Sequence, residues 1–135
     1  MATMHKNSIK EAQRYLDNAK EILSKNAGKD GAYYTDKKYV KLAGHAAWSG
    51  VLVALDGSFK VKENKPKGRR VDFKDYLQAV GKVDKKLPSY LSNAYETLHL
   101  VLGYDGNLNY KVVQSGIEEA KNIIDIASKY YKETA

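Results

Sequence analysis

Apolar residues recur at spacings of three and four along almost the whole chain. This is the spacing of the buried stripe on an amphipathic α-helix, and no stretch alternates with a period of two for long enough to make a strand. Only two prolines interrupt the 135 residues, and no cysteine is present to form a disulfide or a thiolate metal site. The pattern therefore predicts an all-α protein, an antiparallel up-and-down bundle of four to five helices.

Capping and turn residues divide this pattern into helices. The first is predicted over 8–25, because Ser8 and Glu11 have the spacing of a capping box. Asp36 is expected to cap the second, which is apolar on its flanks as well as its stripe and should be the central, most buried helix. The second helix is expected to end at Asp56-Gly57, and Asp72 is expected to cap the third. The fourth helix should begin with Pro88 in its first turn and end at Gly103. A turn at 104–107 should then precede a fifth helix that extends to about Lys132.

The chain is expected to be one domain, 1–135, with a disordered start over 1–7. Its N-terminus has no apolar core of the kind found in signal peptides. The longest mostly apolar stretch, 42–55, contains His45 and is too short to span a bilayer. We therefore expect a cytoplasmic protein without a membrane segment.

Positive charge is concentrated in one predicted loop, 58–71. The chain has a formal net charge of +7, and residues 60–70 alone carry six basic side chains against one acidic one. Such a loop can attract an anionic partner, which we expect to be RNA, a nucleotide or an acidic protein, or it can be merely a solvated connection. The excess of lysine over arginine argues against sequence-specific base recognition. The candidate binding residues are Lys62, Lys65, Lys67, Arg69 and Arg70.

The three histidines do not form a recognisable catalytic or metal-binding pattern. His5 lies near the terminus, and His45 has Ser49 one turn later but no carboxylate spaced to orient its ring. Glu96 and His99 form one Glu-x-x-His motif, whereas di-iron bundles need two, so we expect a simple surface pair. No phosphate-cradling glycine motif occurs. The sequence thus predicts no catalytic residue, metal or cofactor, and favours a protein that is not an enzyme.

Most of the eleven tyrosines fall on apolar stripes, where tyrosine usually fills the edge of a core. Tyr33 and Tyr34 lie outside a stripe, in the connection before the second helix, and could line a pocket or an interface. The candidate pocket residues are Tyr33, Tyr34, Tyr95, His99 and Tyr104.

Three stretches carry a family resemblance: EAQRYLDNAKEIL at 11–23, KLAGHAAWSGVLVAL at 41–55, and LHLVLGYDGN at 98–107 with the helix that follows. They resemble the HEPN-like helical bundles, and more closely a small uncharacterised bacterial family with that fold. The resemblance implies a HEPN-like bundle, a tendency to dimerise along the helices, and a nucleotide- or RNA-related ancestry.

Many HEPN proteins are metal-independent ribonucleases with an Arg followed a few residues later by a His. At the matching place Leu102 stands in the His position, Thr97 or Leu98 stands in the Arg position, and no Arg occurs after Arg70. The first interpretation is therefore a non-catalytic binding or interaction module. Two alternatives remain: a ribonuclease or nucleotide-processing enzyme with a displaced site at Tyr95, Glu96, His99 and Tyr104, and a structural homodimer or engineered scaffold without its own activity.

Overall fold

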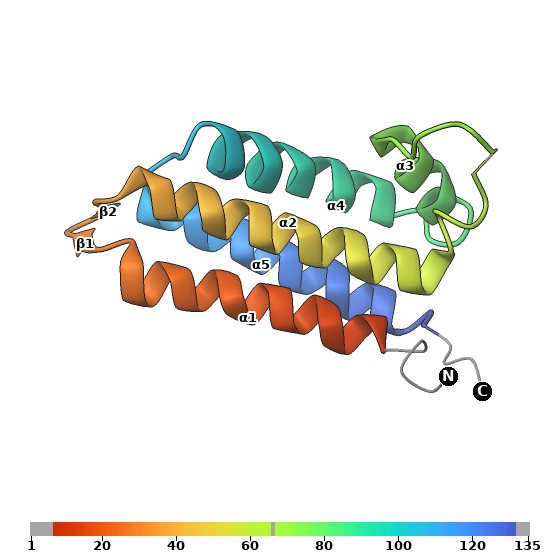
Figure 1. Cartoon of the computed structure of the whole chain (residues 1–135), viewed down its shortest axis with the longest axis horizontal. Coiled ribbons are helices and arrows are strands. Elements are labelled where there is room, and N and C mark those ends of the chain that lie inside the picture. Colours follow the sequence, from red (N-terminus) through yellow and green to blue (C-terminus); the bar gives the residue numbers. More distant parts are fainter. Residues whose placement is uncertain (1–6, 66, 132–135) are drawn as a thin grey trace.

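The computed structural model describes residues 7–65 and 67–131. It is mostly helical, with one very small two-stranded sheet. Figure 1 shows long helices lying side by side, with a short hairpin at one end and a short helix with its loop at the other. The helices are α1 (Ser8–Asn26), α2 (Lys37–Phe59), α3 (Phe73–Gly81), α4 (Leu87–Ala94), its direct continuation η2 (Tyr95–Tyr104), and α5 (Tyr110–Ser128).

Helix α2 is the centre of the bundle, as its composition predicts. It packs against α1, η2 and α5, and nine of its residues are buried. The core formed around it includes Leu55, Leu91, Leu98 and Ile123, all without solvent exposure. Removal of this apolar surface from water is the main driving force for the fold.

Side-chain caps begin α1 and α2, and one of the two differs from the prediction. Asn7, not Ser8, caps α1: its Oδ1 accepts the backbone N–H groups of Ile9 and Lys10 at 2.9 and 3.1 Å. The capping box predicted at Ser8 is therefore wrong by one position. Residues 1–6 of the stretch expected to be disordered lie outside the described residues. Asp36 caps α2 as predicted, through the N–H of Lys38.

The second helix does not end at Asp56-Gly57, as the sequence suggested, but continues to Phe59. Lys60 then adopts a left-handed conformation (φ 56°) and donates its N–H to the carbonyl of Asp56. Gly57 has a packing role instead of a terminating one, because a Cβ there would collide with Ser8 of α1. The basic loop accordingly begins at Lys60.

The expected fourth α-helix changes into a π-helix, η2, over its second half. The Asp105 N–H bonds the Leu100 carbonyl at 2.8 Å, five residues back rather than four. This segment lies against α2 at a very short distance. A Cβ on Gly44 would lie 2.7 Å from the Gly103 nitrogen and 2.9 Å from the Leu98 oxygen. Sequence periodicity does not distinguish the two helix types, so this change was missed.

A two-stranded hairpin joins α1 to α2, where the sequence predicted a loop without strands. β1 (Lys29–Asp30) pairs antiparallel with β2 (Tyr33–Tyr34). The Tyr34 N–H donates to the Leu108 carbonyl, and the Tyr110 N–H donates to the Ala32 carbonyl. These long-range bonds, which sequence inspection does not reveal, fix the hairpin to the start of α5.

Candidate functional site

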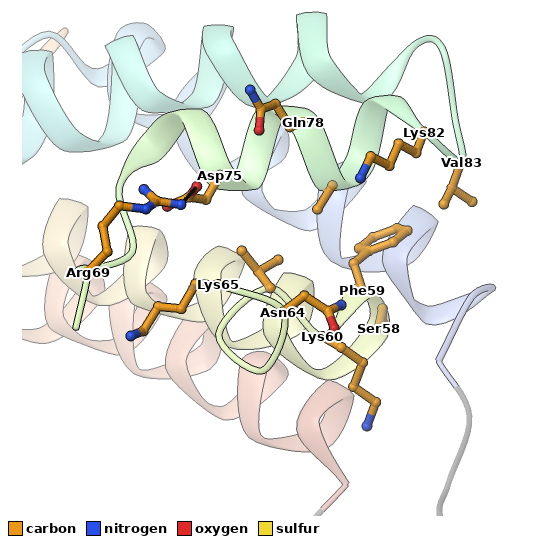
Figure 2. Close-up of a pocket in the computed structure, with 12 residues that line it drawn as sticks. Ser58, Phe59, Lys60, Asn64, Lys65, Arg69, Asp75, Gln78, Lys82 and Val83 are labelled. Atoms are coloured by element: carbon orange, nitrogen blue, oxygen red, sulfur yellow. Dashed lines mark hydrogen bonds and ion pairs between the residues drawn. The ribbon is translucent and has the colours of Figure 1, made fainter. Parts of the chain in front are cut away.

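The basic loop and α3 enclose a cavity of about 560 Å³ at the end of α2. Figure 2 shows Asp75 and Gln78 of α3, with Lys82 directly after its end, on one wall and Asn64 and Lys65 of the loop on the other. Four basic side chains line the cavity against one carboxylate, that of Asp75: Lys60, Lys65, Arg69 and Lys82. The cavity is therefore electropositive, which favours an anionic occupant.

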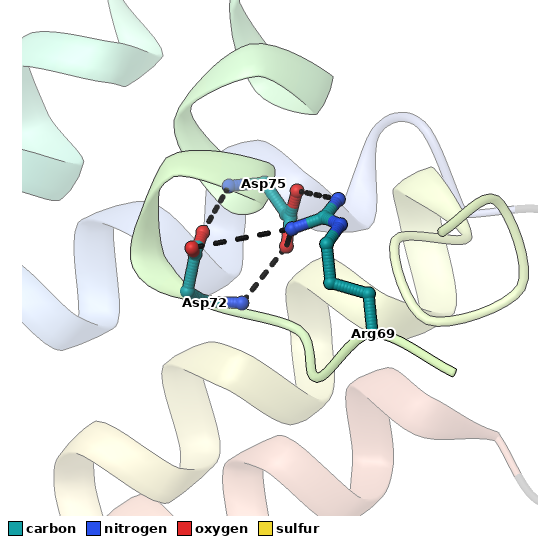
Figure 3. Close-up of polar contacts among 3 residues, drawn as sticks. All are labelled: Arg69, Asp72 and Asp75. Atoms are coloured by element: carbon teal, nitrogen blue, oxygen red, sulfur yellow. Dashed lines mark hydrogen bonds and ion pairs between the residues drawn. The ribbon is translucent and has the colours of Figure 1, made fainter. Parts of the chain in front are cut away.

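Arg69 ties the loop to the first turn of α3. Its guanidinium forms two hydrogen bonds with the Asp75 carboxylate, at 3.1 and 2.7 Å, and lies 4.0 Å from Asp72 (Figure 3). Asp75 also accepts the Asp72 backbone N–H at 2.8 Å, while the Asp72 carboxylate accepts the Asp75 N–H. The Arg69 bonds, followed by this N–H, lower the pKa of Asp75. Because its charge is already paired, Arg69 positions the loop more than it attracts a ligand.

Lys62 has a similar tether at the start of the loop. Its Nζ lies 3.6 Å from Asp56, and its backbone N–H donates to the same carboxylate at 3.3 Å. The Tyr76 hydroxyl donates to Asp56 as well, at 2.9 Å, and burial together with this carboxylate raises the pKa of Tyr76. Asp56 thus connects the end of α2, the loop and α3.

The other three predicted residues, Lys65, Lys67 and Arg70, make no ion pair within the part of the chain that the structure describes. Lys65 and Arg70 line a shallower hollow of about 470 Å³ together with Lys62 and Arg69. Lys67 is exposed on the loop. The structure therefore gathers the predicted basic residues on one loop, and leaves these three with unpaired charges.

Sequence reasoning missed the contribution of α3 to this cavity. Asp75, Gln78 and Lys82 are spaced three and four apart, which places them on one polar face of the helix. That stripe, opposite the buried Tyr76 and Val80, is the signal that could have indicated them. Lys60 was counted in the basic loop but not among the candidate binding residues, and it lines the cavity from the position directly after α2.

The five candidate pocket residues fall in separate places. Tyr34 is buried and packs against Tyr110, with ring centroids 5.4 Å apart. Tyr33 is exposed on the hairpin, and Tyr104 is 75% exposed at the end of η2. Tyr95 and His99 pack together at 5.2 Å, in an aromatic cluster completed by Trp48 and Phe73.

The structure brings His45 and His99 together, with ring centroids 6.3 Å apart. No carboxylate pairs with either ring among residues 7–65 and 67–131, so the expected Glu96–His99 pair is wrong. The turn of η2 is wider than that of an α-helix, and this changes the faces on which its residues lie. Within the same residues no three His, Asp or Glu side chains converge as metal ligands.

The described helices include none that is both long enough and apolar enough to cross a bilayer. Residues 7–129 match the family model described as a domain of unknown function, DUF5618.

The chain belongs to this family. A solved structure of a protein of unknown function from Dyadobacter fermentans is 42% identical, with a TM-score of 0.79 over 90% of this chain and 93% of that one. A protein from Sulfolobus solfataricus shares the fold at 19% identity, with a TM-score of 0.66 over 93% of this chain and 97% of that one. No curated protein matches the sequence.

Proposed function

We propose that this DUF5618 chain is a HEPN-like, non-catalytic binding module whose basic loop holds a phosphate-bearing partner, either single-stranded RNA or a nucleotide. The observation that carries the proposal is the electropositive cavity between the loop and α3. Lys65, Lys67 and Arg70 are without carboxylate partners in the described structure, and Lys82 adds a charge from the opposite wall. Lysines bind phosphate oxygens as mobile point charges, which suits recognition without a defined base sequence.

The direct test is binding of fluorescent single-stranded RNA and of a nucleotide panel at two salt concentrations. The variant replaces Lys65, Lys67, Arg70 and Lys82 by Gln and leaves Lys62 and Arg69, whose pairs with Asp56 and Asp75 position the loop. We expect weaker binding and a flatter salt dependence, with the slope falling by roughly 0.7 per lost contact to a single strand.

A matched control separates the loop from the total charge. Replacing Lys10, Lys111, Lys121 and Lys129 by Gln removes four exposed positive charges from α1, from α5 and from the residue that follows α5. We expect this variant to keep most of the affinity. Equal loss in both variants would mean that net charge alone drives the binding. RNA cleavage abolished by His99→Ala would favour the displaced-site enzyme instead.

A second candidate function, assembly of a homodimer, is favoured by the outer surface of α2. From Leu42 to Leu55 this helix carries no Asp, Glu, Lys or Arg, yet Leu42 is 46% exposed. Ala46, Leu52 and Val53 are only partly buried. An uncharged exposed face suits a second copy of the same helix. Light scattering should give a dimer mass that Leu42→Glu reduces to that of a monomer; a monomer at all concentrations would exclude this role.

A further inference from the structure

A second cavity, of about 380 Å³, lies at the hairpin end of the bundle. Figure 1 shows the hairpin at the opposite end from α3 and the basic loop. The volume of this second cavity falls within the range of small-molecule sites. The side chains that matter come from three elements: Lys20 and Ser24 of α1, Lys29 and Tyr34 of the hairpin, and Tyr110 and Gln114 of α5.

The charge in this cavity is entirely positive. Lys20 and Lys29 line it, no carboxylate is among its lining residues, and neither lysine forms an ion pair within residues 7–65 and 67–131. Lys29 is nevertheless held at the wall, because its Nζ lies 3.9 Å from the centre of the Tyr110 ring. The cavity is thus lined by two lysines, one of them held in place, and by no carboxylate.

Tyr34 adds a buried hydrogen-bond donor. Only 5% of this residue is exposed, and its hydroxyl oxygen accepts the Gln114 Nε2–H at 2.7 Å. No hydrogen bond donated by this hydroxyl occurs in the part of the chain that the structure describes. A tyrosine hydroxyl is protonated at neutral pH, and burial raises the pKa of Tyr34 further above its ordinary value. Buried donors in proteins are almost always satisfied, so an acceptor from outside the chain would complete this group.

We propose that this cavity binds the carboxylate or phosphate group of a small molecule, held by Lys20, Lys29 and the Tyr34 hydroxyl. Two cations and one neutral donor, with no acidic side chain among the lining residues, match the oxygens of such a group. The site is independent of the basic loop, and it involves other helices. A small ligand could therefore bind here while a larger anion occupies the loop.

The test is a titration of the ¹⁵N-labelled protein with phenyl phosphate, benzoate and inorganic phosphate in separate experiments. We expect saturable shifts of amides in residues 28–35 and 110–114. Comparison of the three probes distinguishes a carboxylate from a phosphate and shows whether a ring contributes. Tyr34→Phe keeps the ring and removes only the hydroxyl, and it should weaken binding about tenfold, the usual effect of one hydrogen bond to a charged group.

Lys29→Gln should weaken binding similarly, whereas Lys10→Gln, an equal change of charge at an exposed position of α1, should not. If Tyr34→Phe does not fold, Lys29→Gln against Lys10→Gln decides the question. The absence of saturable shifts with all three probes, shifts confined to residues 60–70, or unchanged affinity in folded Tyr34→Phe and Lys29→Gln would each overturn the proposal.

Discussion

Gly44→Ala tests whether the close approach of α2 and η2 is a requirement of the fold. The added Cβ would lie 2.7 Å from the Gly103 nitrogen, 2.8 Å from the Leu102 Cβ and 2.9 Å from the Leu98 oxygen. Two of these three atoms belong to the backbone, and backbone atoms cannot rotate away as the end of a flexible side chain can. The two helices must therefore separate.

The expected magnitude is a balance of two terms. Alanine is more favourable than glycine within a helix by about 1 kcal/mol. Overpacking a tight contact costs about 1–3 kcal/mol, and contact with the backbone places this site near the upper value. The free energy of unfolding should therefore fall by about 2 kcal/mol, which lowers the Tm of a chain of this size by about 6–8 °C.

Thermal and urea denaturation of the purified variant measure this change. Ser49→Ala is the matched control, because it lies in the same helix, half buried, and should leave stability unchanged or slightly increased through helix propensity. An unchanged or higher Tm for Gly44→Ala would refute the reasoning. It would mean that helix propensity outweighs the contact and that η2 can move away from α2 at little cost.

Two further predictions concern local polar contacts. Asp36→Ala should lower the free energy of unfolding by about 1 kcal/mol, because it removes the acceptor for the Lys38 N–H. Asp36→Asn keeps a side-chain oxygen and should retain the wild-type free energy of unfolding. Equal losses for the two variants in urea denaturation would contradict the role of Asp36 as a cap. The pKa of Asp75 is lowered in the folded chain. The contribution of this carboxylate to the stability of the fold is therefore complete above the ordinary carboxyl pKa, and it is lost as the pH falls through the lowered pKa. The Tm difference between wild type and Arg69→Gln should accordingly shrink from pH 5 to pH 2, and a constant difference would contradict this pairing.

The elements that the sequence predicted correctly are those determined by neighbouring residues. The apolar stripes place the helices, and Asp36 and Asp72 cap them through bonds to residues two or three positions away. The π-helix could not be predicted in this way, because sequence periodicity does not distinguish it from an α-helix, and its close contact with α2 at Gly44 and Gly103 joins residues far apart in the sequence. The hairpin likewise depends on backbone bonds from β2 and Ala32 to residues 108–110.

The same division holds for the candidate site. The number of charges in the loop is visible in the sequence, and so is their position between two helices. Which charges are already paired is not visible, because Asp56 and Asp75 reach the loop from α2 and α3. Pairing separates Lys62 and Arg69, which position the loop, from Lys65 and Arg70, whose charges remain available to an anion.

The two pairs have a consequence that net charge alone does not predict. They fix the loop at Lys62 and at Arg69 before a ligand arrives, so less conformational entropy is lost at these two positions on binding. Asp75→Asn removes a negative charge from the cavity, and an amide oxygen can still accept the Asp72 N–H, but the ion pair with Arg69 is lost. Charge alone predicts tighter RNA binding for this variant. Because salt screens the added charge and not the loss of the tether, we expect weaker binding than wild type at high salt, with the difference narrowing or reversing at low salt. Tighter binding at both salt concentrations would show that the tethers contribute nothing to recognition.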